Sequence, residues 1–289
     1  MTRAFRRARP AVLAALGVLA AAYWFPVAFA ALQSLVAPEE IIALHVDEAS
    51  DVYGSLPCAL LPRAFSWRQY YEVLLHDSAY LMSFWNSAAL SLMCTALSGL
   101  VSVGLGFLLA KGRFFLRGAA VRFVAATMLL PWQAVMLPEY LLSRALGLYD
   151  SWAALVLVQG FSSLGVFLAL QFLRAVPDEL IDVASLDTSS SLTILARVAC
   201  PIAAPGLAAC AAMAFAESWS MVEQPMTLLR DELKYPLSML VNTMSVAHME
   251  IAFACAMVYL FPIVALYVFC GRGLCGGLAP AEGKGGEGA

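Results

Sequence analysis

Six apolar runs, each long enough to cross a lipid bilayer as a helix, constrain this chain more than any other feature of its sequence. A membrane-spanning helix needs about 20 predominantly apolar residues, and each run supplies them. The composition agrees, because 62% of the residues are hydrophobic and 13% are charged, against about 45–50% and about 25% in soluble domains. The sequence therefore predicts an all-α integral membrane protein with six transmembrane helices. These cover 11–37, 81–110, 119–142, 152–173, 201–222 and 251–270.

The first apolar run follows an arginine-rich start, which is typical of an anchor and of a secretory signal alike. Ala28-Phe29-Ala30 is a tolerable cleavage sequence. However, the run exceeds the roughly 7–15 apolar residues of a signal peptide. We therefore favour an uncleaved span over a cleaved signal, with residues 1–10 as a short N-terminal segment.

The basic residues are distributed unevenly between the loops. With the N-terminus inside, 12 of the 17 Lys and Arg residues fall on the cytoplasmic side and 5 on the outer side. Loops rich in Lys and Arg stay in the cytoplasm. This predicts a six-span domain over 11–270 with an acidic outer loop at 38–80. Both termini, the Gly-rich tail 271–289 and the polar segment 174–200 are expected in the cytoplasm.

The segment 174–200 is the one long polar stretch between apolar runs. Pro177 followed by Asp178 and Glu179 is typical of the first turn of a helix, where acids favour the positive end of the dipole. Asp187 is expected to cap a second short helix, and Pro201 and Pro205 to close the segment. Two short helices between two spans form a docking surface and no catalytic pocket.

This segment resembles the cytoplasmic EAA loop of permease subunits of binding-protein-dependent ABC importers. The family's Glu-Ala-Ala triplet corresponds to Asp182-Val183-Ala184, and its Pro-x-x-x-Pro tail to residues 201–205. The family's glycine is replaced by Thr188, a β-branched residue that resists positive φ. Either the turn here uses negative φ, or the loop is a weakened copy that couples poorly. The resemblance implies that Glu179, Asp182, Ala184, Asp187 and Thr188 couple the chain to an ATPase.

Two further stretches extend the resemblance to carbohydrate importers, and specifically to the second permease subunit of the maltose and glycerol-3-phosphate type. They are the proline-bearing run 131–149 and the tail motif at 277–285. The resemblance implies a type I ABC importer permease fold in a bacterial inner (plasma) membrane. It also implies three partners besides membrane lipid: an ATP-binding cassette ATPase dimer, a second permease subunit and an extracytoplasmic solute-binding protein.

The sequence contains no Gly-x-x-x-x-Gly-Lys-Ser/Thr motif. We therefore expect no cofactor bound directly, with ATP used by the partner subunits. Seven cysteines without a Cys-x-x-Cys pair and three histidines predict no metal site. Nothing in the charge pattern indicates nucleic acid.

The fifth apolar run carries the candidate residues for a solute path. Sugars bind through aromatic stacking with carboxylate and amide hydrogen bonds, and Glu217, Trp219, Glu223 and Gln224 offer these groups. A carboxylate within a span is costly and usually faces a partner or a wet cavity. Two ordinary explanations stay open: Glu217 reaches water at the outer end, or Trp219 belongs to the interfacial aromatic belt.

Two other functions remain open at this stage. A membrane-embedded enzyme needs a polar catalytic cluster at one face, and only Glu217, Glu223 and His248 come near one, without a visible nucleophile–base spacing. We therefore name no catalytic residue. A permease for a non-sugar solute such as glycerol phosphate is the second alternative.

Overall fold

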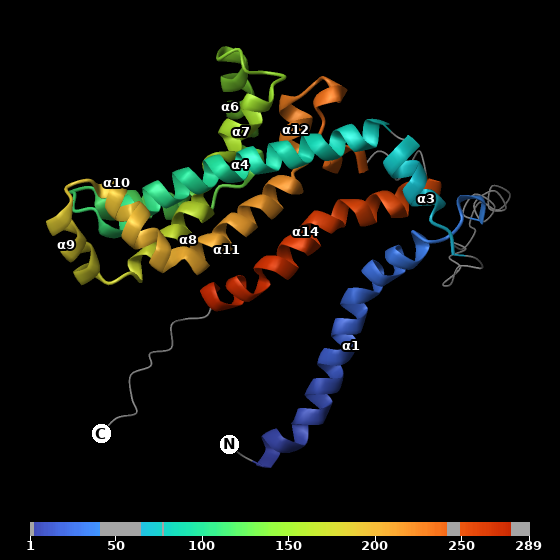
Figure 1. The fold of residues 1–289 in the computed structure, drawn as a ribbon, viewed down its shortest axis with the longest axis horizontal. Coiled ribbons are helices and arrows are strands. Elements are labelled where there is room, and N and C mark those ends of the chain that lie inside the picture. Colours follow the sequence, from blue (N-terminus) through green and yellow to red (C-terminus); the bar gives the residue numbers. More distant parts are fainter. Residues whose placement is uncertain (1–2, 41–64, 77, 242–248, 279–289) are drawn as a thin grey trace. The chain divides into compact units, whose positions relative to one another are not determined.

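The computed structural model describes residues 3–40, 65–76, 78–241 and 249–278, and these residues are helical almost throughout (Figure 1). Within those ranges the strand-like pairing is limited to an isolated antiparallel bridge between Val36 and Phe65. The chain divides into two compact units, residues 1–81 with 240–261 and residues 82–239 with 262–289. The predicted all-α class is confirmed.

The first unit joins the long helix α1 (Arg3–Gln33) to the short α3 (Arg68–Tyr71) and the π-helical turn η2 (Glu72–His76). The buried Gln69 amide donates from Nε2 to the carbonyls of Gln33, at 3.0 Å, and Val36, at 2.6 Å. These bonds tie α3 to the last residue of α1 and to the turn that follows it. The outer loop predicted at 38–80 therefore contains a short helical stretch, formed by α3 and η2. Most of the outer loop, residues 41–64, lies outside the described residues.

The second unit contains most of the helices. Its core forms where α8 packs on α11 and α5. In chain order its elements are α4 (Ser78–Lys111, which starts in the first unit), α5 (Arg117–Thr127), α6 (Trp132–Ala145), α7 (Trp152–Gln159), α8 (Ser163–Arg174), α9 (Asp178–Asp187), α10 (Ser191–Ile194), η3 (Leu195–Ala199), α11 (Cys200–Trp219), α12 (Glu223–Leu228) and η4 (Glu232–Lys234). The last helix, α14 (Met249–Leu278), runs through both units.

Four helices of the described residues are long and apolar enough to cross a membrane, and up to six spans result if each of two bent pairs counts as one. The pair α5 and α6 is bent by 101°, and the pair α7 and α8 by 42°. These pairs correspond to the third and fourth predicted runs. The break in the third run covers residues 128–131 and includes Pro131, whereas α6 continues through Pro138. The six predicted runs thus match the four single-helix candidates and the two bent pairs.

Close approach of α4 and α8 depends on Gly106. A Cβ at this position would lie 2.9 Å from both the Ala169 Cβ and the Leu170 backbone nitrogen. Small residues allow membrane helices to approach in this way. Gly99 and Gly104 in the same helix have open space at their Cβ positions. Among these three glycines, Gly106 is the one that lies at a close contact between helices.

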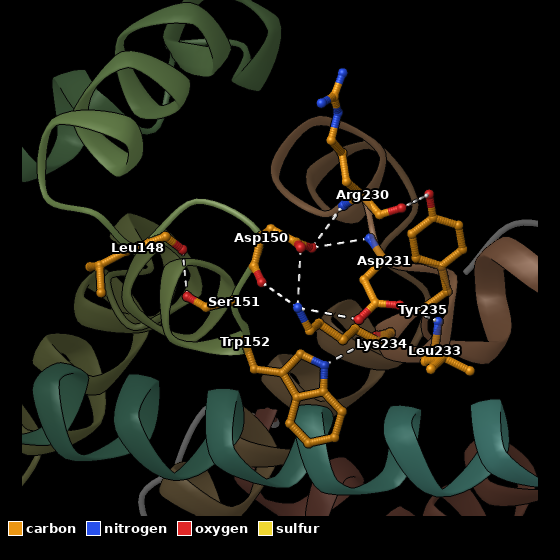
Figure 2. A network of polar contacts seen from close by, with 9 residues as sticks. All are labelled: Leu148, Asp150, Ser151, Trp152, Arg230, Asp231, Leu233, Lys234 and Tyr235. Carbon is orange, nitrogen blue, oxygen red and sulfur yellow. Dashed lines mark hydrogen bonds and ion pairs between the residues drawn. The ribbon is translucent and has the colours of Figure 1, made fainter.

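A network of polar contacts ties the loop between α6 and α7 to the loop after α12 (Figure 2). Asp150 Oδ1 accepts from the backbone N–H groups of Arg230, at 2.9 Å, and Asp231, at 3.1 Å. Lys234 Nζ lies 3.1 Å from Asp150 Oδ2. Trp152 Nε1 donates to the Lys234 carbonyl at 3.1 Å. The backbone N–H bonds, followed by the Lys234 ammonium, lower the Asp150 pKa to about 2. Two loops about 80 residues apart are thereby held together.

The last helix ends later than the sequence predicted. The sixth run was expected to end at Cys270 and to be followed by a Gly-rich tail, but α14 continues to Leu278. The described part of that tail is therefore helical. The remainder of the tail motif and His248 lie outside the described residues.

Candidate functional site

The predicted coupling residues lie on α9 and the turn that follows it, at one end of the second unit (Figure 1). The helix begins directly after Pro177, which sits at the N-cap position, and its first turn carries Asp178 and Glu179. Proline is favourable here because it lacks an N–H group, and the acids complement the helix dipole. The predicted start of this helix is therefore confirmed.

The α9 helix presents two different faces. Ile181, Ala184 and Thr188 are half-buried, and Ile181 packs against the core of α4, α8 and η3. The opposite side carries Leu180, Val183 and Leu186, which are 45%, 62% and 86% exposed. These three residues, termed the α9 outer face, form an apolar surface on a helix that lies outside the candidate spans. The predicted residues Glu179, Asp182 and Asp187 are also exposed.

Basic residues at the end of α4 hold α9 in place. Lys111 Nζ donates to Asp178 Oδ1 at 2.5 Å and also to the Val176 carbonyl. The Lys111 ammonium lowers the pKa of the Asp178 carboxyl below its ordinary value. Arg113 Nη2 lies 4.0 Å from Asp182 Oδ1. Because both side chains are exposed, this ion pair contributes little to stability. The link between α4 and α9 therefore runs mainly through Lys111.

The turn after α9 uses extended backbone. Thr188 has φ −151° and ψ 138°, which any residue adopts, so the substitution of threonine for the family's glycine causes no strain here. Its Oγ1 accepts from the Ser190 N–H at 3.2 Å. The first of the two alternatives for this position, a turn with negative φ, is confirmed.

Two expectations for this segment were wrong. Asp187 is the last residue of α9 and does not cap the next helix; Ser190 does, accepting from the Thr193 N–H. Pro201 and Pro205 do not close the segment, because α10, η3 and α11 form one continuous helical span from Ser191 to Trp219. Both prolines lie inside this span, where each removes one backbone donor from the helix, and the π-helical turn η3 directly before Cys200 and Pro201 departs from the regular α-helical pattern.

A cavity of about 490 Å³ lies where the two bent spans break. Met128 and Leu130, in the break between α5 and α6, line it together with Phe161 and Ser162, in the break between α7 and α8. The Thr127 and Ser163 hydroxyls, 2.9 Å apart, join the two breaks. Non-helical backbone at membrane depth is tolerated only where protein buries it or water reaches it. We term this space the break cavity.

The break cavity has a polar wall. Glu217 of α11 and Gln224 of α12, both predicted as path residues, line it. Glu139 lines it as well and accepts from Trp132 Nε1 at 3.1 Å. The other polar lining residues are neutral and comprise Ser98, Thr127, Gln159, Ser162, Ser163 and Ser218.

The other two predicted path residues lie elsewhere. Trp219 is 1% exposed and packs edge-on against Phe84, with its centroid 5.7 Å away, and in a stack with Phe215. Glu223 is outside the cavity lining and accepts from Gln133 Nε2 at 3.2 Å. Sequence reasoning treated the polar cluster of 217–224 as one surface, whereas the end of α11 at Trp219 turns its members in different directions.

Glu139, Trp132 and Gln159 were missed as candidate path residues. Their signal was the position of Pro131 and Gly160 inside apolar runs, since interrupted spans mark the binding sites of many transporters.

The chain is similar in sequence to known transport proteins. Residues 102–271 match the family described as binding-protein-dependent transport system inner membrane component. The chain is 26% identical over 227 residues to the arabinooligosaccharides transport system permease protein AraQ of Halalkalibacterium halodurans, covering 78% of this chain and 81% of the relative. It is 24% identical to AraQ of Bacillus subtilis, over 93% of each. With the sn-glycerol-3-phosphate transport system permease protein UgpE of Pectobacterium atrosepticum the identity is 25%, over 61% of this chain and 64% of the relative.

The fold is also similar to that of a solved transporter. A chain of a bacterial ABC transporter involved in the import of the acidic polysaccharide alginate superposes with a TM-score of 0.77 and 22% identity, covering 94% of this chain and 98% of that one. The family match covers more than half of the residues, and the superposition shows the same permease fold. This chain therefore belongs to the family of multi-pass inner membrane components of binding-protein-dependent transport systems.

Proposed function

We propose that this chain is a permease subunit of an ABC importer for a carbohydrate-type solute, and that α9 transmits motion from a separate ATPase. Its partners are an ATP-binding cassette dimer, a second permease subunit and an extracytoplasmic solute-binding protein. ATP is bound and hydrolysed by the cassette dimer, and this chain carries out no chemistry of its own. The names of relatives support the solute class, because they include transport of arabinooligosaccharides and of lactose.

The α9 outer face carries this proposal. Leu180, Val183 and Leu186 leave a row of large apolar side chains exposed on a loop outside the candidate spans. Exposed apolar patches outside the bilayer mark protein interaction sites. Lys111 fixes the same helix to the end of α4, so a push on α9 is passed directly into a span. A rigid helix of this kind transmits motion between subunits.

The orientation follows from charge. Twelve of the 17 Lys and Arg residues lie on the side of the N-terminus and α9 in a six-span arrangement. The positive-inside tendency supports a cytoplasmic α9, cytoplasmic termini and access of α9 to the ATPase. In this orientation the loop network around Asp150 faces the solute-binding protein side.

The break cavity is proposed as this chain's part of the solute path. Support comes from the two broken spans that meet there and from Glu217 and Gln224 in its wall. Broken spans that converge at a polar cavity characterise transporter binding sites.

Site-specific photo-crosslinking tests the α9 assignment. A photoreactive amino acid replaces Val183 in the full chain, expressed in its native host, and irradiated membranes are analysed by mass spectrometry. We expect an adduct with an ATP-binding cassette protein. The matched control places the same residue at Leu146, which is 60% exposed at the α6–α7 loop, and is expected to give no such adduct. Equal adducts from both positions, or none from Val183, would contradict the proposal.

A further inference from the structure

The charge on the wall of the break cavity has one sign. Among the described residues that line it, those that ionise are Glu139 and Glu217, and no Lys, Arg or His is among them. The two carboxylates come from different helices, α6 and α11. A cleft lined by one sign of charge concentrates counter-ions and repels ions of its own sign.

Two helix starts oppose this charge without cancelling it. The beginnings of α6 and α8 border the cavity at Trp132 and Ser163, and a helix N-terminus carries roughly half a positive charge. The N-terminus of α8 is already capped, since Ser162 Oγ accepts from the Gly165 N–H at 3.0 Å. The C-terminal ends of α5, α7 and α11 also border the cavity, at Thr127, Gln159 and Ser218. Because a helix C-terminus carries roughly half a negative charge, the helix ends together do not offset the carboxylates.

The remaining polar groups suit hydroxyls. Gln159 and Gln224 offer both donors and acceptors, and five Ser or Thr hydroxyls stand around them. Trp132 and Phe161 supply aromatic surface in the same cavity. Phosphate and carboxylate groups are bound most strongly by Arg or Lys in forked or point-charge contacts, and the described lining contains neither residue.

We infer that this chain's part of the solute path selects uncharged, hydroxyl-rich solutes and excludes anionic ones, through Glu139 and Glu217. The inference rests on the proposed role of the break cavity as the path. It separates two solute classes that a carbohydrate-type importer could serve, neutral glycans on one side and phosphorylated or uronate sugars on the other.

Charged thiol reagents measure the sign of the cavity directly. Ser163→Cys places a small thiol on the wall of the cavity. The full chain, purified with its co-purifying partners in lipid nanodiscs, is treated with trimethylammonium-ethyl or sulfonato-ethyl methanethiosulfonate at low salt. Rates are normalised to those with a free thiol, and labelling of the unsubstituted chain is subtracted. We expect the cationic reagent to react about 10-fold faster than the anionic one after normalisation.

Charge-neutralising variants identify the source of the preference. In Ser163→Cys chains that also carry Glu139→Gln and Glu217→Gln, the ratio of the cationic to the anionic labelling rate is expected to fall to about one. Glu223→Gln is the matched control, because this exposed acid lies outside the cavity lining, and it is expected to leave the preference in place. A ratio near one without the neutralising variants, or a faster anionic reagent, overturns the inference and leaves the path itself standing.

One further result would rule out the break cavity as part of the solute path. If neither reagent labels Ser163→Cys above background in a complex that retains its ATPase, the cavity is closed to solutes and both proposals for it fail. Uptake by cells provides the solute-level check. Chain-dependent uptake of neutral oligosaccharides supports the inference, and chain-dependent uptake of sugar phosphates or uronates alone contradicts it.

Discussion

Thr188 shows how one backbone angle decides whether a departure from a family pattern matters. The position resembles one at which related importers have glycine, yet its φ of −151° is accessible to every residue. The threonine side chain also accepts the Ser190 N–H and so fixes the turn between α9 and α10. The threonine is therefore suited to this turn, and the steric argument for a weakened loop no longer applies.

Thr188→Gly is expected to lower stability and to leave the solute-stimulated ATPase rate of the complex unchanged or reduced. Glycine increases the freedom of the unfolded chain and costs roughly 0.4–1 kcal/mol where the native φ suits a larger residue. Thermal unfolding and ATPase assays in proteoliposomes measure the two effects. Thr188→Ser keeps the hydroxyl and serves as the control. A higher ATPase rate in Thr188→Gly would restore the weakened-loop hypothesis.

Asp150 is the second residue whose backbone is informative. It lies at φ 60°, a left-handed conformation that asparagine and aspartate adopt more readily than other residues apart from glycine. Its carboxylate binds two backbone N–H groups and Lys234. These contacts favour the ionised form, which is why its pKa falls from 3.8 to about 2.

The pH dependence of stability follows from that shift. Because the folded-state pKa is depressed, the stabilisation is complete above the unfolded value of 3.8 and is lost as the pH falls through about 2. Asp150→Asn keeps the left-handed backbone and removes the charge. We expect its thermal unfolding temperature to be lower than that of the unsubstituted chain at neutral pH, with the difference shrinking between pH 4 and pH 2.

Glu232→Gln is the matched control for this measurement. Glu232 is an exposed acid in the same loop as Asp231, and its replacement is expected to leave the pH profile of unfolding unchanged. If Asp150→Asn and Glu232→Gln shift the profile equally, the Asp150 network is not the cause.

At the scale of helices, the packing of α4 on α8 predicts a contrast between two glycines. Gly106→Ala places a methyl group 2.9 Å from backbone and side-chain atoms of α8, and such overpacking costs about 1–3 kcal/mol. Gly99→Ala has open space and should stabilise the helix by about 0.5–1 kcal/mol. Thermal unfolding in one detergent compares the two variants. Equal unfolding temperatures of the two variants would show that stability does not depend on the close approach of α4 and α8.

The attachment of α9 to α4 leads to a prediction about coupling. Lys111→Met keeps the length of the side chain and removes its bonds to Asp178 and the Val176 carbonyl. We expect solute-stimulated ATP hydrolysis to fall while the ATPase still co-purifies, because the α9 outer face is left intact. Asp178→Asn tests whether the two residues act as a pair. The double variant that carries Lys111→Met and Asp178→Asn should lose no more solute-stimulated ATP hydrolysis than Lys111→Met alone. Additive losses would show that the two residues act separately.

The positions of the helices were predictable from the sequence, whereas their bends and connections were not. The apolar runs predicted every candidate span, since length and composition suffice to identify a membrane helix. The 101° bend between α5 and α6 was not predictable. A proline indicates a kink, but its angle depends on what packs around the freed backbone. The continuity of α10 with α11 was missed for a similar reason, since Pro201 was taken as the end of the segment and lies inside the continuous span from Ser191 to Trp219.

For the whole molecule, the fold and family were accessible from the sequence, and the candidate site only in part. The start of α9 at Asp178 followed from local rules that need no tertiary information. The break cavity required the fold, because Glu139 and Glu217 are far apart in the chain and line the same cavity from two different helices. Trp219 had the residue type expected of a sugar contact, and packing against Phe84 and Phe215 places it elsewhere.

Purification of the tagged chain from native membranes, with identification of its partners by mass spectrometry, tests the central claim most directly. The claim predicts recovery of an ATP-binding cassette protein together with a permease subunit, and loss of the cassette protein in a variant with Leu180, Val183 and Leu186 all changed to Asp. Recovery of this chain without any ATPase under mild detergent conditions would contradict the claim that it is an importer subunit.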